Sequence, residues 1–408
     1  MKITLSELCA AVGCKKYPAR WESIYENSMK DFDKNGCLVC KEEFYDEMKA
    51  KYDCFGEFFD LYKQCAKKTA EDEELARFLK LLCDALSDDE NRNNDLKEFS
   101  RPICPEGKDQ LVYDMCTGLA LCSLLDKGAA NIKKRGFDDK TVSETLYSAV
   151  GAVKSFMRTH EGRKGFDLLS WCMLYINGEL FLIDRLEIQF NAKFGARAMI
   201  FTNAEGQTIA LAHEMKLHRD GFALGAKNYS DDEGSYEAFV EETEDFYIGH
   251  PFDKYGYALE KKNLLDKKEW TLRMKKGDKA ISVHIPNRSK GGPLTPETVD
   301  TTLKHAREVM KKSFSDIDHK GFFCESWMMD PKLCDLLGED SNISKFNMRY
   351  TKIPCVSKGT AVFNFIFNQT NPDEVDIKAL PENTKLERAL KNHYLDGNVI
   401  YEMYGVFF

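Results

Sequence analysis

The chain has 408 residues, of which 58 are Lys or Arg and 67 are Asp or Glu, so its formal net charge is −9. That length predicts two or three domains, and 43% apolar residues exclude a disordered chain. Because the balance is acidic, the chain has no general electrostatic affinity for phosphate backbones or anionic lipid, so we expect neither nucleic acid nor a membrane as a partner.

The start of the sequence and the cysteines indicate the compartment. No window reaches the roughly 18 uninterrupted apolar residues of a membrane helix. Thr4 to Glu7 is typical of a helix capping box rather than of an export signal. We therefore expect a cytoplasmic protein whose fourteen cysteines are free and mostly buried. Cys37 and Cys40 have a zinc-like spacing, but no second Cys or His pair accompanies them, so no metal site is predicted.

Residues 1–163 are predicted to be helical. Apolar residues recur at three- and four-residue spacing, as in the stripe from Phe78 to Leu86, and charged residues fill the positions between them. The segment 87–108, with two prolines and a run of charges, is expected to be an exposed connection.

From about residue 166 the hydrophobic period changes to two, which is typical of strands. The apolar runs 168–176 and 180–190 flank Asn177-Gly178, a dipeptide typical of tight hairpin turns, so a β-hairpin is expected there. Two further hairpins are predicted, one from the runs 197–202 and 208–217 and one from the runs 270–274 and 280–285. The middle of the chain therefore predicts a mostly antiparallel sheet.

Beyond Ile285, helices and strands alternate. The order is a glycine-bearing loop, a helix, a strand at 322–327, a helical stretch from Pro331, and late strands at 361–367 and 399–408. This order indicates an α+β fold, with a mixed, mostly antiparallel sheet that is flanked by helices and contains one parallel pair. We place a helical domain at 1–163 and the sheet domain at 164–408, with a site expected at the parallel pair.

The turn after the strand 280–286 contains the first candidate residues. Gly291 and Gly292 precede a helix that begins with Thr295 as its N-cap and with a proline at its first position. Glycines permit close backbone approach, free helix amides attract anions and Arg288 adds positive charge, a combination that suits a pyrophosphate. A purely structural tight turn is the alternative interpretation.

Several short motifs follow one another at plausible spacing. They are His284-Ile285-Pro286, Gly292-Pro293-Leu294, Phe323 to Met328 with Pro331 and Leu333, and Ser341-Asn342-Ile343 with Phe346. In combination they resemble the signature of a GNAT-like acyltransferase C-terminal domain, which that family pairs with a helical N-acyltransferase N-terminal domain. The run from Trp171 to Phe190 is similar to the "GRLQF" strand of the family. Two departures are an insertion of Arg288 to Lys290 and the presence of Asp184 where a glycine commonly precedes the arginine.

The resemblance implies a binding mode for an acyl-CoA co-substrate, acetyl-CoA or another, with no metal. In GNAT folds two neighbouring parallel strands splay apart, the pantetheine arm lies between them, and the pyrophosphate lies on the next helix N-terminus. Here these strands are 281–285 and 322–327. The residues implied to contact acyl-CoA are Val283, Ile285, Arg288, Gly291, Gly292, Leu294, Thr295 and Asn342. Pro293 offers no amide where the pattern has one, and Asn342 fits an ordinary helix cap equally well.

The implied reaction is direct attack of a neutral amine on the thioester carbonyl, which an amide near Val283 or His284 would polarise. A base must keep the amine neutral and an acid must protonate the departing thiolate. If the two strands present Glu325 and His284 on one face, Glu325 is the candidate base with His284 beside it. Tyr350, or less attractively Ser326, is the candidate acid. An ion-paired glutamate, a sheet histidine and a core tyrosine are the structural alternatives.

The leading functional hypothesis is an acyl-CoA-dependent N-acyltransferase that moves an acyl group, with acetyl preferred, to a primary amine of a small molecule or a lysine. A second is a catalytically silent GNAT-like module that binds acyl-CoA or a protein partner as a sensor or scaffold. A third is a structural α+β protein whose glycine turn binds nothing.

Overall fold

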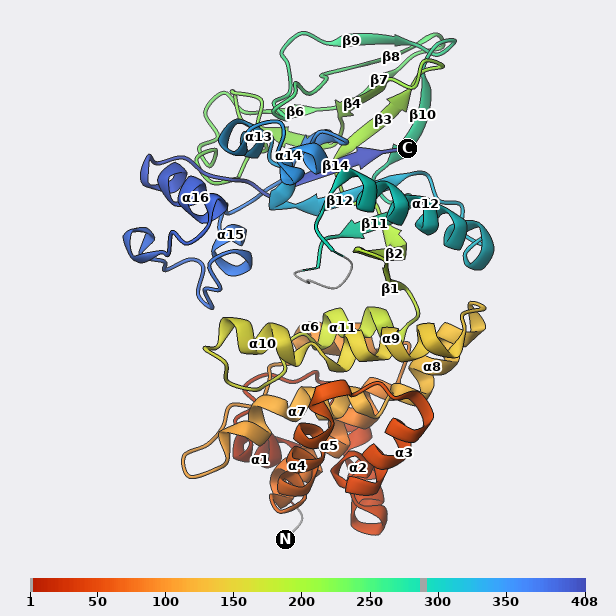
Figure 1. Ribbon diagram of the computed structural model, residues 1–408, viewed down its shortest axis with the longest axis vertical. Coiled ribbons are helices and arrows are strands. Elements are labelled where there is room, and N and C mark those ends of the chain that lie inside the picture. The colour runs from red at the N-terminus through yellow and green to blue at the C-terminus, as the bar shows by residue number, and fades with distance from the viewer. Residues whose placement is uncertain (1–2, 287–291) are drawn as a thin grey trace. The chain divides into compact units, whose positions relative to one another are not determined.

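The computed structural model divides the chain into two compact units, Met1–Phe181 and Leu182–Phe408 (Figure 1). The structure describes residues 3–286 and 292–408. The division lies after Phe181, whereas the sequence analysis placed it after residue 163, so the intervening segment packs with the first unit.

The first unit is helical, as predicted. Its helices are α1 (Leu5–Ala11), α2 (Trp21–Asn35), α3 (Glu42–Tyr52), α4 (Phe59–Ala70), α5 (Glu73–Ser87), α6 (Arg92–Glu98), α7 (Gln110–Cys122), α8 (Leu125–Lys134), α9 (Asp139–Val150), α10 (Val153–Thr159) and α11 (Leu169–Ile176), with 3-10 turns η1 (Leu38–Cys40) and η2 (Gly56–Phe58). The predicted capping box is present: the Glu7 amide donates to Thr4 Oγ1 at 3.2 Å, and the Thr4 amide donates to Glu7 Oε2 at 2.8 Å.

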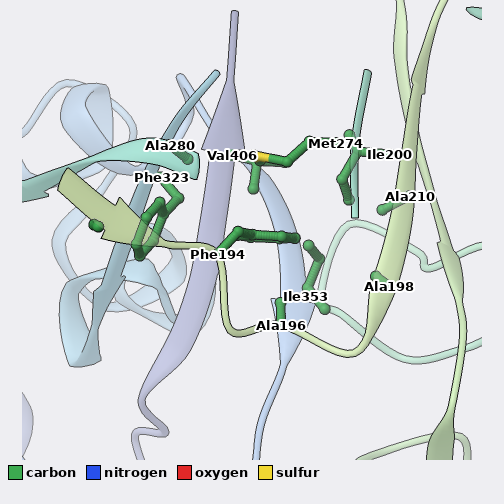
Figure 2. Packing of buried hydrophobic residues seen from close by; sticks show 11 residues of the cluster. Phe194, Ala196, Ala198, Ile200, Ala210, Met274, Ala280, Phe323, Ile353 and Val406 are labelled. Carbon is green, nitrogen blue, oxygen red and sulfur yellow. The ribbon is translucent and has the colours of Figure 1, made fainter. Parts of the chain in front are cut away.

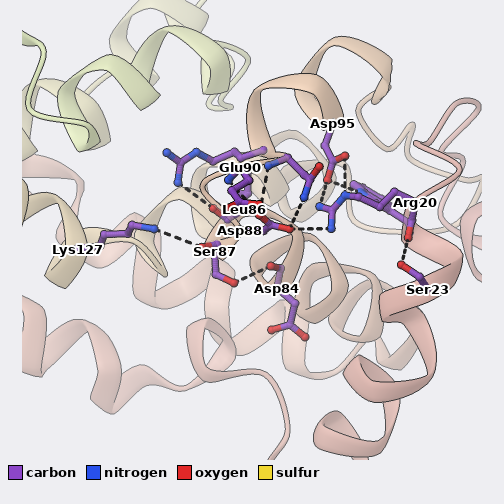
Figure 3. Close-up of polar contacts among 12 residues, drawn as sticks. Arg20, Ser23, Asp84, Leu86, Ser87, Asp88, Glu90, Asp95 and Lys127 are labelled. Atoms are coloured by element: carbon purple, nitrogen blue, oxygen red, sulfur yellow. Dashed lines mark hydrogen bonds and ion pairs between the residues drawn. The ribbon is translucent and has the colours of Figure 1, made fainter.

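The prediction of an exposed connection over 87–108 is wrong in part, because α6 lies within it (Figure 3). Asp95 of this helix is buried and accepts hydrogen bonds from the Trp21 indole at 3.1 Å and from the Arg20 guanidinium. Arg20 also pairs with Asp88 at 3.0 Å. The charges that made the segment look solvated are therefore paired and partly buried.

The predicted hairpin over 168–190 is wrong in its first half. Residues 169–176 form α11 instead of a strand, and Cys172, Met173 and Ile176 of this helix are buried. A short run that is apolar on all sides has no readable period, so helix and strand cannot be told apart from it. Gly178, with φ of +66°, follows the helix end and leads into the first strand.

The second unit is built on a six-stranded mixed sheet in the order β1-β2-β11-β12-β14-β13. Its strands are β1 (Leu180–Ile183), β2 (Leu186–Lys193), β11 (Lys279–His284), β12 (Phe322–Ser326), β13 (Thr351–Pro354) and β14 (Met403–Phe407). The smaller sheets are β10-β3-β4 (Thr271–Lys275, Ala198–Thr202, Thr208–Ala212), β5-β6 (Met215–Leu217, Tyr236–Ala238) and β7-β8-β9 (Glu241–Glu242, Phe246–Gly249, Asn263–Asp266). Helices α12 (Pro296–Ser313), α13 (Lys332–Leu337), α14 (Asn342–Asn347), α15 (Ala361–Phe365) and α16 (Lys385–Leu395) and 3-10 turns η3 (Trp327–Met329) and η4 (Ile377–Ala379) complete the unit. The predicted α+β class is confirmed.

The two faces of the large sheet are covered differently. On one face, Phe323 and Val406 share a buried cluster with Ile200 and Met274 of the β10-β3-β4 sheet, as Figure 2 shows. On the other face α12 packs, with Phe314 at its end stacked on Phe190 at 4.4 Å between ring centroids. Burial on both faces holds the central strands in place.

Other predicted strands differ from the observed ones. The β3–β4 hairpin is confirmed, but β10 pairs with β3 and β11 pairs with β2 and β12, so these two runs belong to different sheets. Residues 361–365 form α15 rather than a strand, and the last strand is shorter than predicted.

None of the described helices combines the length and the apolar composition that a bilayer-spanning helix requires. All fourteen cysteines carry free thiols, and ten of them are buried.

Candidate functional site

The parallel pair of strands separates partway along its length. Strands β11 and β12 are in register at Ile281 with Phe322 and at Ser282 with Phe323. Beyond these pairs, β11 continues to pair only with β2, ending at His284, and β12 continues to pair only with β14, through Ser326. Among the described residues, the ends of β11 and β12 therefore form a fork, and the predicted divergence of the two strands is confirmed.

A helix N-terminus follows the fork. Thr295 caps α12 by accepting a hydrogen bond from the Thr298 amide at 3.3 Å, and Pro296 occupies the first helical position, both as predicted. Leu294 and Gly292, whose φ is +80°, precede the cap. Arg288 and Gly291 lie outside the described residues.

The register places His284 and Glu325 on one face of the sheet. Ser282 and Phe323 are direct partners in a parallel pair, so their side chains share a face, and two residues further along each strand the same holds for His284 and Glu325. Glu325 is exposed. Glu325 and His284 therefore lie on one face of the sheet, as the candidate roles from the sequence analysis require.

His284 lies at the end of β11, directly opposite Glu187 of β2. The side chain is partly exposed at the strand end, and burial lowers the pKa of its imidazole to about 4. A histidine in this state is neutral at physiological pH, so it can take part in hydrogen bonding or proton transfer without adding positive charge to the site.

Strand β14 and the residue just before it add two side chains that the sequence analysis missed. Tyr404 lies directly opposite Glu325, and burial followed by the charge and hydrogen bonding of Glu325 raises the pKa of its phenol. Glu402 lies two residues earlier, and burial followed by the charge of Glu325 raises the pKa of its carboxyl. Within the described part of the chain, neither carboxylate has a cation within ion-pair distance. These residues join the site because β14 inserts beside β12, which no local pattern signals.

Tyr350 lies on the opposite face from Glu325. Its ring is perpendicular to that of Phe407 at 5.0 Å, and Gly405 allows its close approach, since a Cβ at that glycine would be 2.8 Å from the Tyr350 Cβ. Gly405 and Phe407 alternate with Tyr404 along β14. The Tyr350 hydroxyl is buried and has no hydrogen-bond partner among the described residues.

The remaining predicted residues lie near the strand ends and the helix starts. Val283 is buried and pairs with Ile188 of β2, and Ile285 follows the strand end. The hydroxyl of Ser326 accepts from the Met328 amide at 3.1 Å and so caps η3. Asn342 is exposed at the start of α14, where the capping side chain is that of its neighbour Ser341.

A cavity of about 400 Å³ lies elsewhere in the unit. Arg273, Arg349 and Phe408 are among its lining residues, and none of the predicted site residues lines it. Within the described ranges, no group of three or more His, Cys, Asp or Glu side chains is arranged to hold a metal ion.

Comparisons with known proteins give the family of the second unit and the fold of the chain. A family profile described as the GNAT-like C-terminal domain matches residues 181–407. An acyltransferase in complex with decanoyl-CoA and teicoplanin aligns with a TM-score of 0.59 at 17% identity, over 99% of this chain and 99% of that chain. An acyltransferase in complex with CoA and 10C-teicoplanin aligns with a TM-score of 0.57 at 17% identity, again over 99% of both chains. At these identities the likeness shows the fold.

No curated protein matches the sequence. The family profile nevertheless spans more than half of the 408 residues, including both strands of the fork and the helix that follows them. The protein therefore belongs to the family that carries the GNAT-like C-terminal domain, and the GNAT-like acyltransferase family that the motifs predicted is confirmed.

Proposed function

We propose that the protein is an acyl-CoA-dependent N-acyltransferase that moves an acyl group to a primary amine by direct attack in a ternary complex. The observation that carries this proposal is the fork between β11 and β12, where the facing edges of the two strands form no ladder with each other beyond Ser282 and Phe323 in the part of the chain that the structure describes. An extended pantetheine arm offers amides that can pair with backbone groups at such edges. Solved acyltransferases of the same fold are in complex with decanoyl-CoA or CoA, which supports the choice of donor.

The donor would be held by the end of β11 and the start of α12. The amide of Val283 or His284 would polarise the thioester carbonyl and stabilise the oxyanion, and Ile285 would extend the backbone contacts. The N-terminal end of α12, which carries the positive end of the helix dipole, would face the pyrophosphate. Glu297 in the first turn is exposed, so solvent screens its charge.

Glu325 would act as the general base and His284 would assist it on the same face of the sheet. The absence of a paired cation among the described residues leaves the Glu325 carboxylate available to accept the ammonium proton of the acceptor. The product thiolate would take a proton from Tyr350, which lies on the opposite face of the sheet from Glu325 and would reach the sulfur where β11 and β12 separate. Its buried hydroxyl has no partner among the described residues, and a catalytic role is one explanation of such a group.

The substrates are proposed as a small-molecule amine acceptor and an acyl-CoA, with the reaction taking place in the cytoplasm. Fourteen free cysteines suit a reducing compartment. The acidic net charge of −9 favours a cationic acceptor. Because a structural neighbour, a mutant acyltransferase, is in complex with octanoyl-CoA, the donor panel runs from acetyl-CoA to decanoyl-CoA.

The test measures free thiol released from each acyl-CoA in the presence of a panel of amines. We expect turnover that needs both substrates, and an E325Q variant whose kcat is about 100-fold lower while acyl-CoA still binds. E237Q, a change at an exposed glutamate of β6, is the matched control and should keep full activity. Saturable CoA binding without turnover for any amine would favour the silent sensor or scaffold, and no CoA binding would refute both the enzyme and the acyl-CoA sensor.

A further inference from the structure

The turn between β1 and β2 is attached to the helix that follows the fork. Asp184 in this turn has φ of +46°, in the left-handed region that glycine tolerates best and Asp tolerates better than most residues. Its carboxylate lies 2.6 Å from Nδ1 of His305 on α12. Asp184 therefore adopts the positive φ that the turn requires. Unlike the glycine common at this place, it also has a side chain that contacts α12.

Arg185, the next residue, contacts both elements of the proposed donor site. Its amide donates to Thr302 Oγ1 of α12 at 3.3 Å, and its Nη1 donates to the carbonyl oxygen of Pro286 at 3.1 Å. Thr302 in turn donates to the Thr298 carbonyl in the first turns of the helix, at 2.8 Å. One residue thus connects the chain just after β11 to the N-terminal half of α12.

This connection lies at the end of β11, where the hydrogen-bond ladders to the neighbouring strands stop. Beyond Ser282, β11 has lost its ladder to β12, and its ladder to β2 ends at His284. Pro286 has no amide and cannot extend a ladder. The hydrogen bond from Arg185 therefore holds the segment directly after the amides that would polarise the thioester carbonyl.

Arg185 is itself held in place, because its side chain is buried with an exposed fraction of 8%. We propose that Arg185 is a positioning residue, which fixes the end of β11 relative to the start of α12 and so sets the affinity for the acyl-CoA donor. This inference rests on the proposed function.

The experiment compares R185Q and R185K with the wild type and with R307Q in the full-length chain. Arg307 is also a partly buried arginine of this region, but it lies over the Phe322 ring at 4.6 Å and, among the described residues, has no hydrogen bond to Pro286 or Thr302, so it is a matched control. We expect R185Q to raise the Kd for CoA and the KM for acyl-CoA at least tenfold. The KM for the amine should change less than twofold, R185K should recover part of the loss, and R307Q should stay within threefold of the wild type.

A second measurement is independent of activity. Hydrogen exchange of a peptide covering 281–286 should be at least tenfold faster in R185Q than in R307Q, with exchange in β14 unchanged. Where R185Q does not fold, T302V removes the acceptor of the Arg185 amide and should give the same pattern at smaller size.

Equal effects of R185Q and R307Q, or equal losses for donor and acceptor, would overturn the role of Arg185. A wild type that binds no CoA would instead overturn the proposed function, and the exchange data would still decide whether Arg185 positions the strand end.

Discussion

Protonation of His284 should destabilise the second unit in mild acid. Burial lowers the pKa of this imidazole to about 4 in the folded chain, whereas an unfolded chain has a histidine pKa of about 6.5. The unfolded state therefore binds the proton more readily, so stability is complete above pH 6.5 and falls as the pH drops towards 4. From the two pKa values, this site alone lowers the free energy of unfolding by about 2 kcal/mol at pH 5 and by about 3.4 kcal/mol at the acid limit.

Two measurements check this prediction. In a nuclear magnetic resonance titration, the imidazole signal that disappears in H284N should have its midpoint near pH 4. In urea unfolding followed at pH 7.5 and pH 5, the wild type should lose about 2 kcal/mol more than H284N, since the other histidines contribute equally to both proteins. A midpoint near 6.5, or the same acid sensitivity in both proteins, would refute the assigned burial of His284.

Three further substitutions test other parts of the site. Burial and the charge of Glu325 raise the pKa of Glu402, so the charged carboxylate lowers the stability of the fold above that pKa. The E402Q variant should therefore raise Tm by about 2 °C at pH 8 but not at pH 4.5. Equal shifts at both pH values would contradict this. Y350F should lower kcat at least tenfold without lowering Tm, because the hydroxyl has no partner among the described residues to lose; an unchanged kcat would remove Tyr350 from the mechanism. G405A should lower Tm by several degrees, because its Cβ would lie 2.5 Å from Met329 Sδ; circular dichroism melts would detect the absence of such a loss.

The features that the sequence predicted correctly are those with local chemical signals. The N-cap and proline that begin α12 need only the residues beside them, because a hydroxyl and a fixed φ act within one turn. The fork was predicted from the resemblance carried by His284 to Pro286 and Phe323 to Met328, and the observed register agrees with it.

The features that the sequence missed depend on distant partners. The run over 169–176 is a helix because its surroundings bury all its sides, which erases the period on which the prediction relied. Glu402 and Tyr404 join the site only because β14 pairs with β12, across some eighty residues of sequence. The catalytic roles of Glu325, His284 and Tyr350 stay predictions until the variants are measured.

The order of the strands also constrains how the second unit is made. Strand β13 pairs with β14, and β14 is also the neighbour of β12 on its side away from β11, although about fifty residues separate β13 from β14. Until those residues have left the ribosome, the edges of β12 and β13 that later pair with β14 lack this partner, and unpaired strand edges readily bind other chains. A nascent or truncated product that stops short of Met403 should therefore be a preferred client of chaperones and should accumulate in inclusion bodies rather than as a partly active enzyme.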